Sequence, residues 1–147
     1  MAVRSLRADR RAFVCTWPFR RTFVVAEGLI AVNGVIGTAM LVTNTYVPDV
    51  SVLRPIGLHS WTLPGLWLFA SVAAPSAMAC RAAARRHART PEAVLLASGL
   101  LLVELLVQLP FLGFDPLQPV MGVPALVLAG LALRARRDGW RPGTQSV

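Results

Sequence analysis

Four polar side chains interrupt long apolar runs in this chain, and they are the residues most able to do chemistry. Glu104 and Gln108 lie one helical turn apart within residues 90–110, a run that contains eight leucines and three valines. Glu27 and Asn33 interrupt an earlier run. A carboxyl group in such surroundings can join helices by hydrogen bonds, carry a proton or an ion, or contact a partner subunit or a lipid headgroup. The residue types alone leave these three roles open.

Patterns typical of enzymes and metal sites are missing from the sequence. Cys15 and Cys80 form no CxxC pair, and His59 and His87 belong to segments that we expect on opposite sides of a membrane. The sequence has no glycine-rich phosphate loop, no nucleophile elbow and no acid-rich metal cluster. We therefore expect a protein that is not an enzyme, with no catalytic residues and no cofactor or metal.

Four apolar segments are long enough to cross a bilayer, at about residues 22–42, 61–80, 91–110 and 117–133. At about 1.5 Å per residue, twenty helical residues span roughly 30 Å, the thickness of a hydrocarbon core. These segments predict an all-α polytopic membrane protein, a bundle of four transmembrane helices forming one domain over residues 1–147. Residues 1–21 form a basic head and residues 134–147 a polar tail.

The third segment is expected to insert despite its glutamate. Thr90, Pro91 and Glu92 form a helix start, with a hydroxyl cap, proline in the first turn and an acid at the positive end of the dipole. A charge at the depth of Glu104 costs about 2.5–3.5 kcal/mol, and each leucine or valine returns about 0.3–0.6 kcal/mol. The segment therefore inserts, but Glu104 needs a polar partner or a water-filled cavity.

The basic residues predict the orientation of the chain. All fifteen are arginines, against seven acids, and they gather in the head, in the turn between the second and third segments, and in the tail. With four spans these regions share one side, so the positive-inside rule places both termini in the cytoplasm of a bacterial cell, with the chain in its inner membrane. Arg81, Arg85, Arg86 and Arg89 in the turn are expected to contact anionic lipid rather than nucleic acid.

The first segment separates into two faces when it is projected as a helix. Glu27, Asn33, Gly34, Gly37 and Thr38 share the smaller and more polar side. That side is typical of helix packing in lipid, where small residues let backbones approach closely. The other side should face lipid, and it comprises Val24, Val25, Leu29, Val32, Val35, Ile36 and Ala39.

The depths of the polar residues predict their contacts. Asn33, Gly37 and Thr38 come near the depth of Glu104, which favours a polar contact between the first and third segments. Glu27 lies close to the inner end of its helix, within reach of arginines that extend to the headgroups.

Proline punctuates the second segment. Pro64 falls in the first turn, where it is tolerated. Pro75 lies deep in the segment and should kink it, with Ser71 or Ser76 able to satisfy the carbonyl groups that lose their donor.

Three short motifs carry a family resemblance over about residues 22–137. They are Glu27 with Asn33-Gly34 and Gly37, the stretch LPGLWLF at 63–69, and Leu117-Gln118-Pro119. With them the chain resembles small four-helix integral membrane proteins of GC-rich bacteria. The resemblance implies the fold and no activity.

Two functions are compatible with these features. The first is an accessory, assembly or interaction subunit of a larger membrane complex, since the soluble parts are short and the helices have more small and polar surface than four helices need among themselves. The alternative is a homo-oligomeric transporter or channel coupled to ions or protons, with Glu104 as the working group. The expected partners are an anionic inner leaflet and another membrane protein or a second copy of the chain.

Overall fold

A computed structural model describes residues 17–45, 47–113 and 116–137. Every regular element in these ranges is helical, and the predicted all-α four-helix bundle is confirmed. The elements are α2 (Trp17–Val42), η1 (Val50–Ile56), α3 (Thr62–Leu68), η2 (Phe69–Ala73), α4 (Ala74–Ala84), α5 (Thr90–Leu112) and α6 (Leu117–Arg137).

Four helical stretches are long and apolar enough to cross a membrane: Phe19–Val42, Thr62–Ala84, Thr90–Pro110 and Gln118–Arg137. Large apolar side chains cover their outer surfaces, among them Leu29, Leu106 and Leu126, which are each at least 60% exposed. Exposed apolar surface on this scale suits hydrocarbon rather than water. The chain therefore fits a multi-pass membrane protein.

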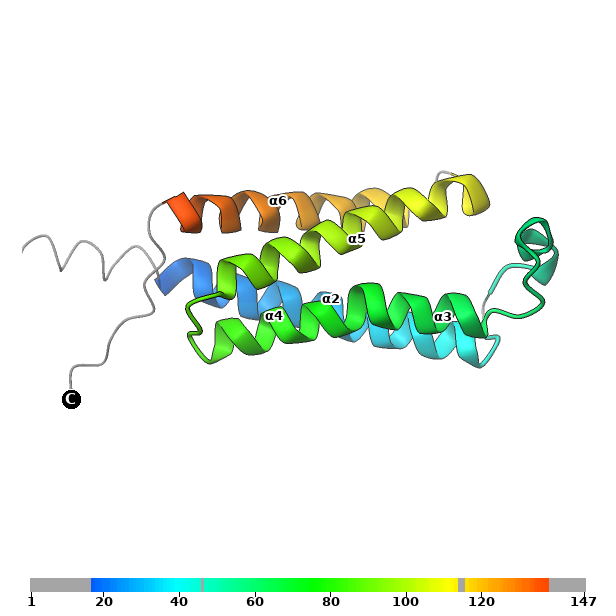
Figure 1. Ribbon diagram of the computed structural model, residues 1–147, viewed down its shortest axis with the longest axis horizontal. Helices are drawn as coiled ribbons and strands as arrows, with labels where there is room; N and C mark the ends of the chain where they lie inside the picture. The colour runs from blue at the N-terminus through cyan, green and yellow to red at the C-terminus, as the bar shows by residue number, and fades with distance from the viewer. Residues whose placement is uncertain (1–16, 46, 114–115, 138–147) are drawn as a thin grey trace, which may run out of the picture.

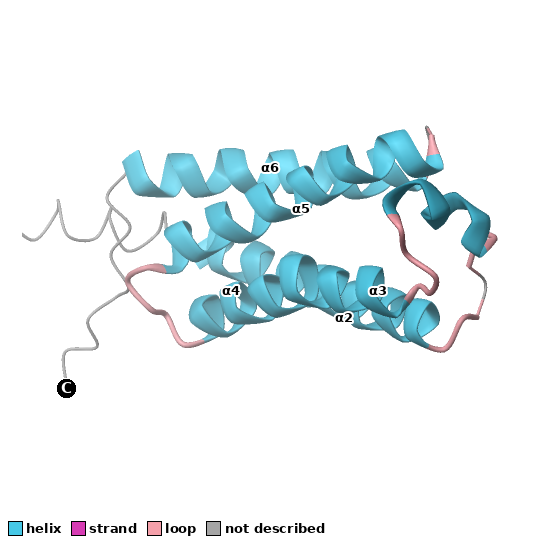
Figure 2. Ribbon diagram, turned by 45° about the vertical axis from the view of Figure 1, so that its right-hand side comes forward, coloured by secondary structure: helices cyan, strands magenta, loops and turns pink. Residues whose placement is uncertain are grey.

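The spans form two antiparallel hairpins (Figures 1 and 2). One hairpin joins α2 to the continuous stack of α3, η2 and α4, and the other joins α5 to α6. The α5–α6 hairpin lies close to α4 at the end where α4 stops, and the two hairpins diverge toward the opposite end, where η1 lies. This divergence separates α2 from α6 in the half of the bundle that contains Glu104.

Arginines gather at the end where the hairpins approach each other. The described start of α2, the turn between α4 and α5, and the end of α6 all lie there (Figure 1). Arg20 donates hydrogen bonds from Nε to the carbonyl of Ala83 and from Nη2 to that of Ala84, at 3.1 and 3.0 Å. It thereby satisfies carbonyl groups at the end of α4. Five other arginines of the head and tail lie outside the described residues, at positions 4, 7, 10, 11 and 141.

Several helices extend beyond the predicted bounds. The first begins at Trp17 rather than near residue 22, because Pro18 suits the first turn of a helix. The last continues to Arg137 rather than to residue 133, since arginines in a final turn interact favourably with the helix dipole. Thr90 is the first residue of α5, and its hydroxyl donates back to His87 O at 2.6 Å, so the prediction that it caps the helix was wrong.

The core between the hairpins is built mainly from small side chains. Phe23 and Leu128 are the largest apolar side chains that are almost fully buried. Alanines make up much of the rest: Ala79, Ala83, Ala97, Ala125 and Ala132. Small residues let membrane helices approach closely, so backbone proximity stabilises this bundle more than large interdigitating side chains do.

A π-helical segment, η2, interrupts the second span at residues 69–73. The N–H of Ala74 donates to Phe69 O, five residues back instead of four. Pro75 follows directly, and it has no N–H to give to Ser71 O. The distortion expected from Pro75 is therefore present as a π turn just before it, and the extra residue changes which side chains face α5.

A close helix contact in the first hairpin involves Ala73, the last residue of this π turn. A Cβ atom on Gly34 would lie 3.0 Å from Ala73 Cβ and 3.1 Å from the Ala73 backbone. Gly65 is similarly close to Leu41, at 3.0 Å from its Cβ. A side chain on Gly37 would meet Leu68 Cδ2 at 3.1 Å, which is the movable end of a side chain. Gly34 is thus the position at which α2 most needs glycine.

The predicted faces of the first helix are largely as expected, with two differences. Val25, Leu29, Val32, Val35 and Ile36 are exposed. Val24, expected on the lipid side, is half-buried against the core, and Asn33, expected on the packing side, is exposed. Both residues lie near the boundary between the faces, where a small rotation of the helix decides their burial.

Candidate functional site

Glu104 is buried within the bundle, 7% exposed, and its carboxyl group accepts hydrogen bonds from three side chains. Trp67 Nε1 donates to Oε2 at 2.6 Å, and Ser71 Oγ lies 3.1 Å from the same oxygen. Gln108 Nε2 donates to Oε1 at 3.2 Å. The Ser71 hydroxyl also lies 2.8 Å from Trp67 O, so its single proton can serve either acceptor.

Two different spacings bring these donors to one carboxyl group. Gln108 lies one turn after Glu104 on α5, as the sequence predicts. Trp67 on α3 and Ser71 within the π turn are four residues apart on the second span, and both side chains reach Glu104 on α5. The indole ring remains 57% exposed while its N–H reaches inward, so the apolar surface can meet lipid and the polar edge can bond Glu104.

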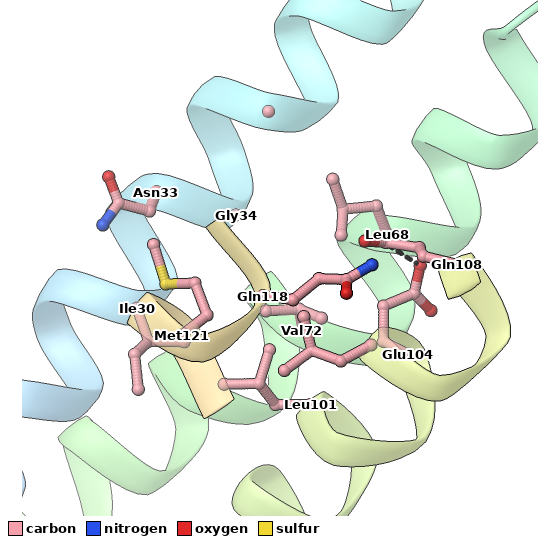
Figure 3. A pocket seen from close by; sticks show the side chains of 12 residues that line it. Ile30, Asn33, Gly34, Leu68, Val72, Leu101, Glu104, Gln108, Gln118 and Met121 are labelled. Atoms are coloured by element: carbon pink, nitrogen blue, oxygen red, sulfur yellow. Dashed lines mark hydrogen bonds between the residues drawn. The ribbon is translucent and has the colours of Figure 1, made fainter. Parts of the chain in front are cut away.

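A cavity of about 200 Å³ lies beside this carboxyl group, between the two hairpins. All four spans line it, and Figure 3 shows Glu104, Gln108 and Gln118 among the side chains that surround it. The apolar lining includes Ile30, Leu68, Val72, Leu101, Leu105 and Met121. The volume is far above the roughly 15 Å³ that one water molecule requires. The cavity can therefore hold several water molecules or one small organic group.

The prediction that Glu104 forms a polar contact with the first segment was wrong. The described partners of Glu104 from other spans lie on α3 and η2, not on α2. Thr38 Oγ1 donates to Gly34 O within its own helix, at 2.8 Å. Asn33 and Gly37 line the cavity, but the Asn33 amide points away from Glu104 in Figure 3. The rotation of α2 accounts for the difference, because it turns Asn33 outward.

Glu27 lies in different surroundings from Glu104. Its side chain is 1% exposed, and within the described ranges neither carboxyl oxygen has a hydrogen-bond partner. No arginine of the described part of the chain forms an ion pair with it, contrary to the expectation of a nearby snorkelling arginine; Arg20 bonds α4 instead. The buried side chain of Ser76 on α4 lies close to this carboxyl group but forms no well-aligned hydrogen bond with it. A buried carboxyl group without such a bond is costly, so Glu27 is expected to lower stability.

The basic turn between α4 and α5 is a surface feature. Arg81, Arg85 and Arg89 are exposed, and Arg86 adopts a left-handed backbone conformation with φ of 54°. Glu92 and Arg136 lie 3.8 Å apart at the same end of the bundle, with both side chains more than half exposed. An exposed pair of this kind contributes little stability.

Three residues at the site were missed by sequence reasoning. Trp67 was noted only as part of the stretch LPGLWLF, Ser71 as a possible partner for a backbone carbonyl, and Gln118 as part of the Leu117-Gln118-Pro119 motif. The available signal for Trp67 and Ser71 was their spacing of four residues, which places two donors on one helix face. Gln118 gave no comparable signal, because its place depends on how α6 packs.

Chemically, the site offers an acceptor-rich carboxyl group in an apolar cavity. The described residues contain no group of three or more His, Cys, Asp or Glu side chains that could hold a metal ion. Comparison with family models, with curated proteins and with solved structures gives no match.

Proposed function

We propose that this chain is a non-catalytic interaction subunit of a larger assembly in a bacterial inner membrane, with both termini in the cytoplasm. The observation that carries the proposal is an exposed amide within the membrane-spanning part of α2, beside a cavity between the hairpins. Asn33 is exposed and makes no hydrogen bond with any other described residue.

The cost of exposing polar groups to lipid supports this proposal. Asn33 lies fourteen residues into the span that begins at Phe19, which corresponds to about 21 Å from that end. An amide at this depth meets hydrocarbon, where leaving donors and acceptors unpaired costs free energy. A polar group from another polypeptide could form a hydrogen bond with the Asn33 amide and fill part of the cavity that Asn33 helps to line.

Purification in a mild detergent tests the proposal. The wild-type chain should carry a foreign polypeptide at a constant molar ratio, and Asn33→Leu should reduce that ratio severalfold. Val32→Leu is the matched control, since Val32 is an exposed neighbour on the same helix that offers no hydrogen bond. An assembly that contains only copies of this chain, or a partner retained fully in Asn33→Leu, would contradict the proposal.

A second function is favoured by a separate observation, namely that the cavity touches all four spans and the Glu104 carboxyl group. Such a cavity suits a transporter or channel that moves protons or ions and assembles as a homo-oligomer. The distinguishing experiment is reconstitution of the purified chain alone in vesicles. A flux that disappears in Glu104→Gln, in a folded protein, would favour transport over the interaction role.

A further inference from the structure

We propose that the cavity beside Glu104 is a binding site for a primary ammonium group carried on a short alkyl chain. The group can belong to a free small alkylamine or to a lysine side chain on a membrane helix of a partner. The site chemistry stands on the cavity alone, and only the second source rests on the proposed interaction function.

Hydrogen-bond acceptors face the cavity without matching donors. Gln118 Nε2 donates to Gly113 O at 2.9 Å, and Gln108 Nε2 donates to Glu104. These two bonds fix the direction of each amide and leave each Oε1 without a donor among the described residues. Glu104 Oε1 receives only the long bond from Gln108, so it can accept another. Three oxygen atoms, Oε1 of Gln108, of Gln118 and of Glu104, can therefore each accept a further hydrogen bond.

The charge of the lining points in the same direction. Among the twelve residues that line the cavity, Glu104 is the only ionisable one, and no arginine or histidine accompanies it. A charged carboxyl group inside a membrane protein is expected to pair with a cation. An ammonium group can supply both the missing hydrogen-bond donors and the missing cation, because it carries a positive charge and three N–H groups.

The size of the cavity restricts the rest of the ligand. Its 200 Å³ lies below the range of about 300–1,000 Å³ typical of sites for drug-sized molecules. Ile30, Val72, Leu101 and Met121 form apolar walls near the polar end (Figure 3). A short alkyl chain would bury its methylene groups against these walls while the ammonium group reaches the oxygens. A bulky or multiply charged ligand does not fit this lining.

Titration of the full-length chain with butylammonium tests the site. The protein is held in phosphatidylcholine bilayers, whose headgroups carry no N–H donor, and the indole N–H signal of Trp67 is followed by nuclear magnetic resonance. Trp67 bonds Glu104 directly, so a ligand on the carboxyl group should shift this signal in a saturable way. Butanol and tetramethylammonium should not, since one lacks the charge and the other lacks N–H groups.

Two variants link the effect to the cavity. Glu104→Gln should weaken butylammonium binding about tenfold or more, in line with the loss of a hydrogen bond to a charged group. Glu92→Gln, an exposed acid on the same helix, should not. Gln118→Leu removes one acceptor and leaves the bonds to Glu104 in place, so it should weaken binding without moving the free-state Trp67 signal. An unchanged Trp61 signal shows that each variant is folded.

The source of the ammonium group is settled by a second probe. A leucine-rich transmembrane peptide with one central lysine should associate with the chain in the same bilayers, and the association is measured by fluorescence energy transfer. Glu104→Gln should abolish the association. A control peptide with norleucine in place of the lysine should not associate. Association identifies a partner side chain, and butylammonium binding alone identifies a free amine. The site is refuted if neither probe binds, or if Glu104→Gln binds them equally. The interaction function fails separately, by the Asn33 experiment.

Discussion

Trp67 and Glu104 join the two hairpins through a hydrogen bond of 2.6 Å between indole Nε1 and carboxyl Oε2. The residues are 37 positions apart, on α3 and α5. The bond is formed where the hairpins diverge, so it acts as a tie across the bundle at the edge of the cavity.

Removal of the tie should weaken the bundle modestly. Trp67→Phe keeps an aromatic ring but deletes the N–H, and the free energy of unfolding should fall by about 0.6–2 kcal/mol, the range for hydrogen bonds between membrane helices. The measurement is unfolding in mixed detergent micelles followed by circular dichroism. Trp61→Phe is the control at a second indole, whose N–H bonds Pro48 O outside the cavity. If Trp67→Phe cost nothing, the bond would have no structural role.

The π turn should be needed for the tie. Pro75→Ala restores an N–H that can donate to Ser71 O, which favours a regular α-helix and rotates Trp67 and Ser71 relative to α5. The coupling between Trp67→Phe and Glu104→Gln, measured in a double-mutant cycle, should fall toward zero in that background. Pro64→Ala, in the first turn of α3, should leave the coupling intact. Equal coupling in both backgrounds would contradict the predicted dependence of the Trp67–Glu104 bond on the π turn at Pro75.

Glycine at position 34 should be needed for the contact between α2 and the π turn. Gly34→Ala places a methyl group about 3 Å from the Ala73 backbone, so the helices must move apart, at a cost of about 1–3 kcal/mol. Gly130→Ala is the matched control, because a Cβ atom there meets nothing within 4 Å. The control should leave stability unchanged or raise it by up to about 1 kcal/mol through helix propensity. Thermal unfolding in detergent compares the two, and equal stabilities would contradict the close approach.

The two buried glutamates should respond to substitution with opposite signs. Glu27→Met removes a carboxyl group that has no partner among the described residues, so the free energy of unfolding should rise by about 1–3 kcal/mol. Glu104→Met removes a carboxyl group with three partners, and it should lower the free energy of unfolding by about 0.6–2 kcal/mol. Detergent unfolding of both variants measures the difference. A loss of stability in Glu27→Met would reveal a partner for that group.

Orientation is testable by cysteine labelling in intact cells. The native cysteines are first replaced by Cys15→Ser and Cys80→Ser. The serine hydroxyl at position 80 can still donate a hydrogen bond to Val24 O, as the Cys80 thiol does. In this background, a cysteine at Ala88 should be protected from an impermeant reagent, and one at Val50 should react, because the positive-inside rule predicts a cytoplasmic location for the arginine-rich end. Permeabilised cells control for intrinsic reactivity. Labelling at position 88 from outside would reverse the proposed topology.

The four spans and the segregation of charge could be predicted from the sequence by itself. Both depend on local quantities: a run of about twenty apolar residues has one low-energy arrangement in a bilayer, and short arginine clusters remain beside the ends of such runs. The same local reasoning paired Glu104 with Gln108, since a spacing of four residues defines one face of a helix. It also identified Pro75 as the point of distortion in the second span.

The partners of the polar groups were decided by the tertiary structure. A helix that rotates by a fraction of a turn exchanges the side chains at the boundary of its faces, which is why Asn33 lies outside and Val24 packs inward. The π turn adds one residue to a turn of the second span, directly beside Trp67 and around Ser71, the two residues of this span that bond Glu104. Glu27, of the same residue type, forms no hydrogen bond with the described residues, and Arg20 bonds the end of α4 instead. Such choices depend on the relative rotation of helices far apart in the chain, which local spacing does not encode.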